Sequence, residues 1–150
     1  MGCDIHMFRE VHRDGRWECL EEEYEEDYGT DEEPDMALHL RSLPVSRNYW
    51  LFGLLADGVR TQWEFSWQPR GLPNDVTELV KADHERWDSD AHTASWLGMA
   101  EIQQKALELL ILPGQEAPQL GKMLGDLINM LEWPEGIPSG DCRIVFWFDN

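Results

Sequence analysis

The chain has 150 residues, 42% of them hydrophobic and 11% aromatic, and its 30 acidic and 12 basic residues give a formal net charge of −18. The hydrophobic content excludes a disordered chain, and the charge excludes a basic protein that neutralises the phosphates of duplex nucleic acid. The charge also disfavours binding to an anionic membrane, and no apolar run approaches the roughly 18 residues of a membrane-spanning helix. Because no secretory signal pattern is present, we expect one cytoplasmic domain over residues 1–150.

The first forty residues predict a β-hairpin followed by an acidic loop. Residues 4–12 alternate between apolar and polar, and Asp14-Gly15 is a strong turn signal before a returning strand over 17–20. Eleven of the 30 acidic residues fall between Glu18 and Asp35. A block of like charges repels itself, so we expect a solvated loop at about 21–35.

The remaining elements are predicted from hydrophobic periodicity and from capping and turn residues. In chain order, we expect a helix over 49–55 capped by Ser46 or Asn48, a strand over 63–67, a helix capped by Asp75, a polar loop over 88–93, helices over 99–112 and 119–133, and a strand over 143–148.

Strand parity indicates how the two ends of the chain pair. If the first and last strands run antiparallel with Asp4 opposite Asp149, apolar side chains meet apolar ones and Glu10 meets Arg143. A slip of one residue would break every match. We therefore predict an α+β fold with a small antiparallel sheet, in which the N-terminal hairpin pairs with the C-terminal strand and the helices pack on one face.

The predicted pairing gathers acidic and histidine side chains at one edge of the sheet. Asp90-Ala91-His92 repeats the spacing of Asp4-Ile5-His6, and each pair could offer an oxygen and a nitrogen to one ion. Such a mixed site suits Mn, Fe or Zn, so the candidate metal ligands are Asp4, His6, Asp90, His92 and Asp149. The alternative is that both histidines only form hydrogen bonds with nearby acids.

A second group of residues combines arginine with aromatic side chains. Arginine forms two-pronged contacts with phosphate and stacks on rings, and tryptophan can stack on a base. The candidate ligand-binding residues are Arg47, Tyr49, Arg60, Arg70 and Trp96. The alternative is that these arginines pair with the surplus of acids, and that most tryptophans belong to the core.

The three cysteines, Cys3, Cys19 and Cys142, are too few and too widely spaced for a disulfide framework or a thiolate zinc site. We expect reduced and partly buried thiols.

Several short blocks of this sequence resemble a group of small uncharacterised proteins encoded by tailed bacteriophages and prophages. The blocks are Met1-Gly2-Cys3-Asp4-Ile5-His6, Arg47-Asn48-Tyr49 with Leu51-Phe52, Leu55-Ala56-Asp57-Gly58-Val59-Arg60, Pro69-Arg70-Gly71-Leu72-Pro73, residues 90–97 and residues 143–150. The resemblance implies a phage origin and implies no activity.

The leading hypothesis is a phage accessory protein of the anti-defence type, whose pocket binds a small phosphorylated ligand of the nucleotide class. Arg47, Arg60 and Arg70 would clamp the phosphate. If the Asp/His group holds a divalent metal, the bound water would hydrolyse a nucleotide phosphodiester. Walker, dinucleotide-binding, esterase and zincin motifs are absent from the sequence.

The alternative hypothesis is an acidic inhibitor that mimics DNA and blocks a basic host protein. Complementary charge would make such an association fast and sensitive to salt. The clustering of acids in one segment, instead of along a helical face, argues against it. A structural phage protein without a ligand is a third hypothesis, and all three are compatible with a homo-oligomer.

Overall fold

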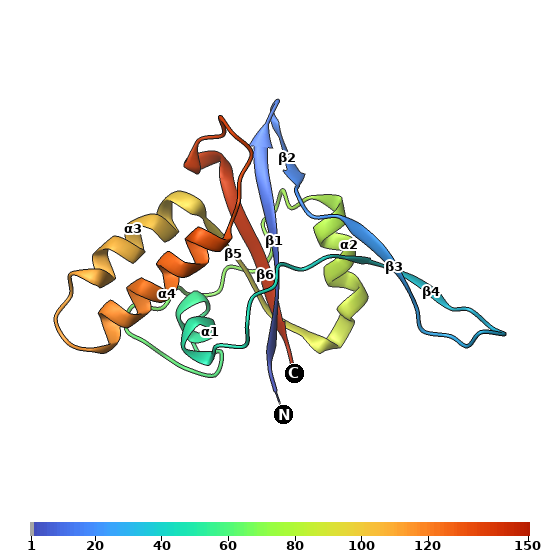
Figure 1. Ribbon diagram of the computed structural model, residues 1–150, viewed down its shortest axis with the longest axis horizontal. Coiled ribbons are helices and arrows are strands. Elements are labelled where there is room, and N and C mark those ends of the chain that lie inside the picture. The colour runs from blue at the N-terminus through green and yellow to red at the C-terminus, as the bar shows by residue number, and fades with distance from the viewer. Residues whose placement is uncertain (1) are drawn as a thin grey trace.

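A computed structural model describes residues 2–150 of the chain. One antiparallel sheet has the strand order β2-β1-β6-β5, with the bounds Asp4–Arg13 (β1), Arg16–Cys19 (β2), Ala91–Gly98 (β5) and Cys142–Asp149 (β6). The strands nearest the two chain ends therefore lie side by side in the middle of the sheet (Figure 1). Together with four α-helices, this sheet makes the fold α+β, as predicted.

The pairing of β1 with β6 has the predicted register. Asp4 lies opposite Asp149, and Glu10 lies opposite Arg143. The turn from β1 into β2 is at Asp14 and Gly15, which both have positive φ, at 55° and 78°. Positive φ at both central residues is what an Asp-Gly hairpin turn requires. The sequence pattern therefore predicted the centre of the sheet correctly.

Three helices cover one face of the sheet, namely α1 (Tyr49–Leu55), α3 (Met99–Leu110) and α4 (Glu116–Met130). The side chain of Asn48 caps α1 by accepting hydrogen bonds from the backbone nitrogens of Trp50 and Leu51. Buried side chains of these helices form the main core with one set of alternating sheet residues, which includes Ile5, Met7, Ile144, Phe146 and Phe148. This arrangement matches the prediction of helices on one face.

The helix α2 (Glu78–Trp87) lies on the opposite face of the sheet (Figure 1). A second, smaller core joins Val80 of this helix to Phe8, Val145 and Trp147 of the sheet. The prediction that all helices share one face is therefore wrong for α2. In residues 2–150, no helix combines the length and the apolar character needed to cross a membrane.

The acidic segment forms a second β-hairpin instead of the predicted loop. β3 (Glu23–Asp27) and β4 (Met36–Leu40) pair antiparallel as a separate two-stranded sheet, and only residues 28–35 form a turn. The hairpin projects from the body of the molecule beside α2 (Figure 1). The charge is tolerated in a strand because each acid of β3 lies opposite an uncharged residue of β4, as Glu25 does opposite Leu38.

Two further segments differ from their predicted structure. The polar loop expected over 88–93 is a short 3₁₀ turn, η1 (Asp88–Asp90), followed at once by the edge strand β5. The strand expected over 63–67 is irregular, because the Trp67 backbone nitrogen donates to the carbonyl of Leu54 instead of to a neighbouring strand. A second 3₁₀ turn, η2 (Ser139–Asp141), precedes β6.

The predicted helix cap at Asp75 is also wrong. α2 begins after Thr77, and the Asp75 side chain instead forms an ion pair with Arg143 of β6. The Asp75 carboxylate therefore accepts a charge-assisted hydrogen bond from Arg143 and caps no helix.

Candidate functional site

The register of β1 and β6 brings Asp4, His6 and Asp149 to one end of the sheet, as predicted. The Nε2 atom of His6 lies 2.6 Å from Oδ2 of Asp149, and Arg47 holds Asp4 through two hydrogen bonds of 3.0 Å. The hydrogen bonds from Arg47 keep the pKa of Asp4 below its usual value. The two carboxylates can lie close together because each has a partner of its own.

Tyr49 and Arg60 lie at the same end of the sheet. The Tyr49 hydroxyl accepts a hydrogen bond from the backbone nitrogen of Cys3, and the Arg60 guanidinium lies 5.1 Å from the centroid of the Tyr49 ring. Arg60 also donates to the side chain of Asn150. Three of the five predicted ligand-binding residues, Arg47, Tyr49 and Arg60, therefore connect the region around α1 to the start of β1 and the end of β6.

The five predicted metal ligands do not converge on one centre. His92 lies opposite Phe148 and stacks on its ring at 6.1 Å on the main-core face, whereas His6 lies opposite Trp147 on the α2 face. The sheet thus separates the two imidazoles. In the described part of the chain, no group of three or more His, Cys, Asp or Glu side chains is arranged to hold a metal ion.

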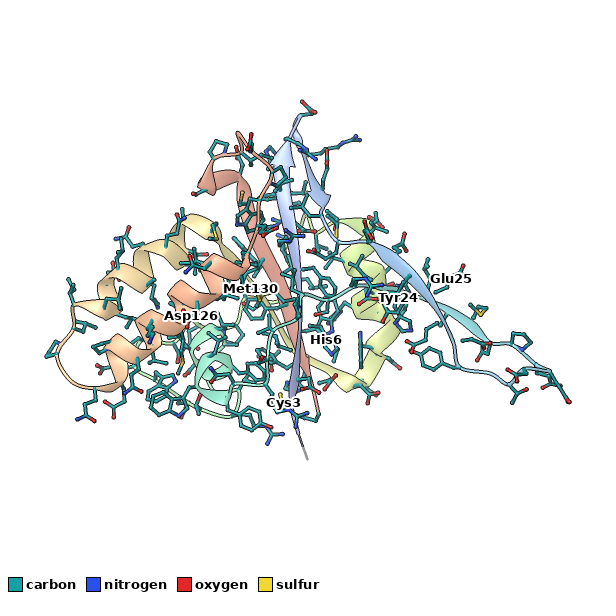
Figure 2. The ribbon with its side chains drawn as sticks, in the orientation of Figure 1. Cys3, His6, Tyr24, Glu25, Asp126 and Met130 are labelled. Atoms are coloured by element: carbon teal, nitrogen blue, oxygen red, sulfur yellow. The ribbon has the colours of Figure 1, made fainter. Side chains whose placement is uncertain are left out.

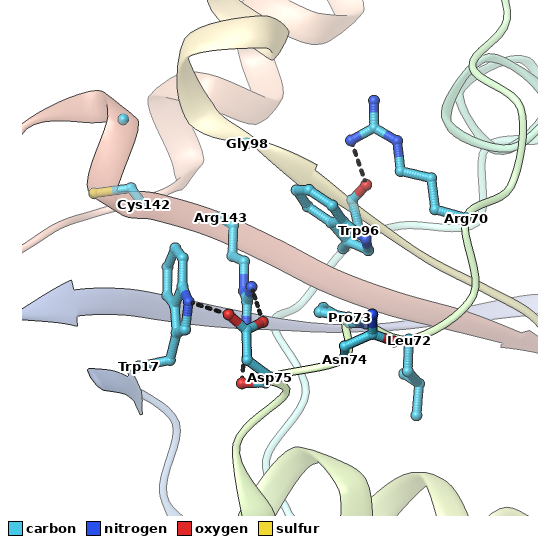
Figure 3. A pocket seen from close by; sticks show the side chains of 11 residues that line it. Trp17, Arg70, Leu72, Pro73, Asn74, Asp75, Trp96, Gly98, Cys142 and Arg143 are labelled. Atoms are coloured by element: carbon cyan, nitrogen blue, oxygen red, sulfur yellow. Dashed lines mark hydrogen bonds and ion pairs between the residues drawn. The ribbon is translucent and has the colours of Figure 1, made fainter. Parts of the chain in front are cut away.

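Arg70 and Trp96, the other two predicted ligand-binding residues, line a cavity of about 650 Å³ that Figure 3 shows from close by. The Arg70 guanidinium lies 4.7 Å from the centroid of the Trp96 ring and is 2.6 Å from Oε1 of Glu101. The two residues are therefore in contact with each other, but they are separate from the group around Tyr49.

Arg143 is the buried cation of the same cavity. Its guanidinium lies 3.7 Å from the centroid of the Trp17 ring and pairs with Glu10 and Asp75 at 2.8 Å each (Figure 3 shows the Asp75 pair). Glu10 is fully buried and also accepts a hydrogen bond from the backbone nitrogen of Thr77. The pair with Arg143 lowers the pKa of Asp75. Carboxylates therefore neutralise both arginines here, and a phosphate would have to displace them.

A second cavity, of about 620 Å³, lies between α2 and the β3–β4 hairpin, and we call it the hairpin–α2 pocket. Its size is within the range of about 300–1,000 Å³ that is typical of sites for small ligands. Figure 2 shows Tyr24 on the part of the hairpin that is nearest to α2. The residues that give the pocket its chemistry are His6, Tyr24, Tyr28, His39, Arg41 and Trp87.

Aromatic rings in close contact make up much of this wall. The rings of His6 and Trp87 are 4.2 Å apart, and those of Tyr24 and His39 are 5.7 Å apart and stacked. The Tyr28 hydroxyl lies 2.9 Å from Nε2 of His39 and donates to the carboxylate of Glu26, which raises the pKa of Tyr28. The wall of the pocket therefore consists of aromatic rings that hold each other in place through ring–ring contacts.

Arg41 is the cation of the pocket that is best placed to bind an anion. Six other arginines form ion pairs with carboxylates, namely Arg9, Arg13, Arg47, Arg70, Arg86 and Arg143. Among residues 2–150, Arg41 forms no such pair, and its guanidinium lies 4.9 Å from the centroid of the Tyr24 ring. Arg86 also lines the pocket, but it is paired with the buried Asp83 at 3.1 Å.

Sequence reasoning missed most of this pocket because it treated the acidic segment as a loop. Of the predicted site residues, only His6 and Asp90 line it. A usable signal was present: Tyr24 and Tyr28 flank Glu26 at a spacing of two, and His39 precedes Arg41 at the same spacing. Such alternation places side chains on one face of a strand.

The three thiols are free and poorly suited to nucleophilic chemistry. Cys3 and Cys142 are buried, and burial raises the pKa of both thiols. Burial also raises the pKa of Cys19 to about 12.

Because the thiolate is the reactive form, we expect iodoacetamide at neutral pH to alkylate the folded protein at least about tenfold more slowly than free cysteine. Mass spectrometry over time measures this, with urea-denatured protein as the control that takes up three labels. Rapid labelling of Cys19 in the folded protein would contradict this expectation.

No family model, curated protein or solved structure matches this chain.

Proposed function

We propose that the protein binds a small nucleotide-type ligand in the hairpin–α2 pocket, with a phosphate against Arg41 and a base among the aromatic rings. The observation that carries this proposal is the Arg41 guanidinium, which has no carboxylate partner within residues 2–150 of a chain with a net charge of −18. In a protein with such a surplus of acids, an arginine without an ion pair beside a cavity favours binding of an anion there.

The aromatic wall supports the base half of the ligand. Stacking on an aromatic side chain contributes about 1–3 kcal/mol per base, and it works for any base because each has a flat π-surface. Tyr24 and Trp87 provide two such surfaces, and the phenol of Tyr28 and the imidazole of His39 provide polar atoms beside them. A planar ring with one anionic group matches this combination better than a purely apolar ligand does.

The charge of the pocket limits how many phosphates the ligand carries. Besides Arg41, the pocket is lined by three carboxylates, those of Glu26, Asp83 and Asp90. Of these three, only Asp83 forms an ion pair with an arginine, Arg86. Each further negative charge on the ligand adds repulsion from these groups. We therefore propose a ligand with one phosphodiester or one monophosphate, such as a cyclic nucleotide, in preference to a triphosphate.

His6 is positioned to contribute a hydrogen bond to this ligand. Asp149 holds Nε2 of His6 at 2.6 Å, so Nδ1 is the ring nitrogen left for a bound group. Packing against Trp87 fixes the ring plane. The proposal is one of binding and includes no metal-dependent hydrolysis, because His6 and His92 lie on opposite faces of the sheet.

The resemblance to phage proteins suggests a use for such binding. A phage accessory protein that binds a signalling nucleotide could remove the signal from a bacterial defence system. We propose this anti-defence role as the biological setting, on the sequence resemblance alone.

Isothermal titration calorimetry with 3′,5′-cyclic AMP, AMP and ATP as probes tests the proposal. We expect cyclic AMP and AMP to bind, and ATP to bind more weakly. Arg41→Gln should weaken binding by at least about tenfold, since a hydrogen bond to a charged group contributes about 1.5–3 kcal/mol.

The matched control is Arg16→Gln, which removes the same charge from an exposed position on β2. It should bind as the wild type does. Equal affinity of the wild type and the Arg41 variant, or no binding of any of the three nucleotides, would show that the proposal is wrong.

A further inference from the structure

We infer that the outer face of the β3–β4 hairpin docks against a basic, extended segment of another protein. This outer face carries Glu23, Glu25, Asp27, Met36 and Leu38, with the buried Leu40 at its base. The inference concerns the side of the hairpin that does not carry Tyr24 and His39, and it does not depend on nucleotide binding.

The two faces of the hairpin follow from its register. The pairs Glu25–Leu38 and Asp27–Met36 alternate along the strands with Tyr24–His39 and Glu26–Ala37. Alternate pairs in a β-ladder lie on opposite faces. One face therefore supplies rings to the hairpin–α2 pocket, and the other presents acids beside two large apolar side chains.

Three apolar side chains, those of Leu40, Leu38 and Met36, follow one another along the outer face, and α2 covers only the first of them. Leu40 is 4% exposed and is packed with Val80 of α2 and with Phe8 and Trp147 of the sheet. Leu38 and Met36, at the next two positions on the same face, are 40% and 53% exposed. The same row of side chains is thus buried at one end and uncovered at the other, where the hairpin leaves the body of the molecule (Figure 1).

The backbone edges of the hairpin are also without partners. The two strands form a sheet of their own, so each has one edge with no neighbouring strand among residues 2–150. Proteins protect such edges with charge or cover them, and an unpaired edge accepts an extended segment of another chain through main-chain hydrogen bonds.

Charge complementarity identifies the occupant as basic. Glu23, Glu25 and Asp27 lie on this face, and the turn that follows adds Asp31, Glu32, Glu33 and Asp35. Between positions 21 and 41 the chain has a single Lys or Arg, at Arg41. Two copies of a chain with net charge −18 repel each other, which disfavours a second copy on this face. Lysine and arginine satisfy both features of the face, because their aliphatic stems cover apolar side chains while their charges meet carboxylates.

The probe for the test is a fluorescein-labelled peptide of alternating lysine and valine, and its acidic twin has glutamate in place of lysine. Fluorescence anisotropy with the full chain should show binding of the basic peptide alone, and affinity should fall as salt rises from about 50 to about 500 mM. The double variant Met36→Ser/Leu38→Ser should bind the basic peptide about tenfold more weakly, because the apolar centre of an interface dominates its affinity.

The matched control is Leu107→Ser/Ile111→Ser, which removes two exposed apolar residues, 68% and 85% exposed, from the far end of α3. It should bind the basic peptide as the wild type does. Equal weakening in both double variants, or equal affinity of both with the wild type, would overturn the inference.

Sedimentation of the protein alone tests whether a second copy of this chain occupies the outer face instead. A monomer at all concentrations agrees with the inference, whereas a dimer that Met36→Ser/Leu38→Ser dissociates would overturn it in favour of a second copy. Circular dichroism of both double variants should match that of the wild type, since all four positions are exposed.

Discussion

Replacing Glu10 by glutamine is expected to lower the free energy of unfolding by about 3–5 kcal/mol, the usual cost of removing one partner from a buried ion pair. Glu10 is fully buried, and the side chain of Arg143 is 4% exposed. Glutamine has nearly the same shape as glutamate, so packing is preserved while the guanidinium is left without its buried counter-charge. Asp75 cannot replace Glu10, because its side chain is 65% exposed and its charge is screened by water.

Urea denaturation of the wild type and of two variants measures this effect. Glu18→Gln breaks the exposed pair with Arg13 and should cost less than about 1 kcal/mol. The double variant Glu10→Leu/Arg143→Met removes both buried charges and should recover much of the lost stability. A Glu10→Gln variant as stable as Glu18→Gln would show that the buried pair stabilises the fold no more than an exposed pair does.

Replacing Trp147 by alanine is expected to lower the free energy of unfolding by about 3–5 kcal/mol through the cavity that it leaves. Trp147 is fully buried on the α2 face, with the rings of Phe8 and His84 at 5.0 and 4.9 Å. Partial burial of His84 beside the indole lowers the pKa of that imidazole. The ring of Trp147 is also stacked with that of His6, with centroids 6.2 Å apart. Because His6 lines the hairpin–α2 pocket, the variant should disturb that pocket as well.

Trp147→Phe provides the matched comparison. The indole nitrogen of Trp147 is buried and has no hydrogen-bond partner among residues 2–150, so phenylalanine keeps an aromatic ring and removes an unsatisfied donor. We expect Trp147→Phe to lose far less stability than Trp147→Ala in the same denaturation experiment. Similar losses in the two variants would contradict the cavity as the cause of the destabilisation.

The central fold was predictable because β1 and β6 follow simple rules. Their alternation leaves one register in which apolar residues meet and Glu10 meets Arg143, and the structure has that register. The edge strand β5 was missed because its ladder is interrupted between His92 and Ser95, where Thr93 has a φ of 56°. A bulge shifts the alternation by one residue, so the strand does not show the period of two in its sequence.

The candidate site was predictable only where it follows from strand pairing, and not where it depends on how distant segments pack. The group around Asp4, His6 and Asp149 follows from the register and was predicted. The hairpin–α2 pocket depends on how β4 packs on α2, where Asp83 accepts a hydrogen bond from the Leu40 backbone nitrogen. That contact joins residues 43 positions apart, and no local pattern in the sequence indicates it.

Native mass spectrometry tests the proposed nucleotide binding most directly. Wild-type protein and the Arg41→Gln and Arg16→Gln variants are purified gently, mixed with cyclic AMP, and measured beside denatured samples. The proposal predicts a mass increase equal to one nucleotide on the native wild type and on Arg16→Gln, and its loss in Arg41→Gln. A bare native mass for the wild type, or an equal increase in all three proteins, would contradict it.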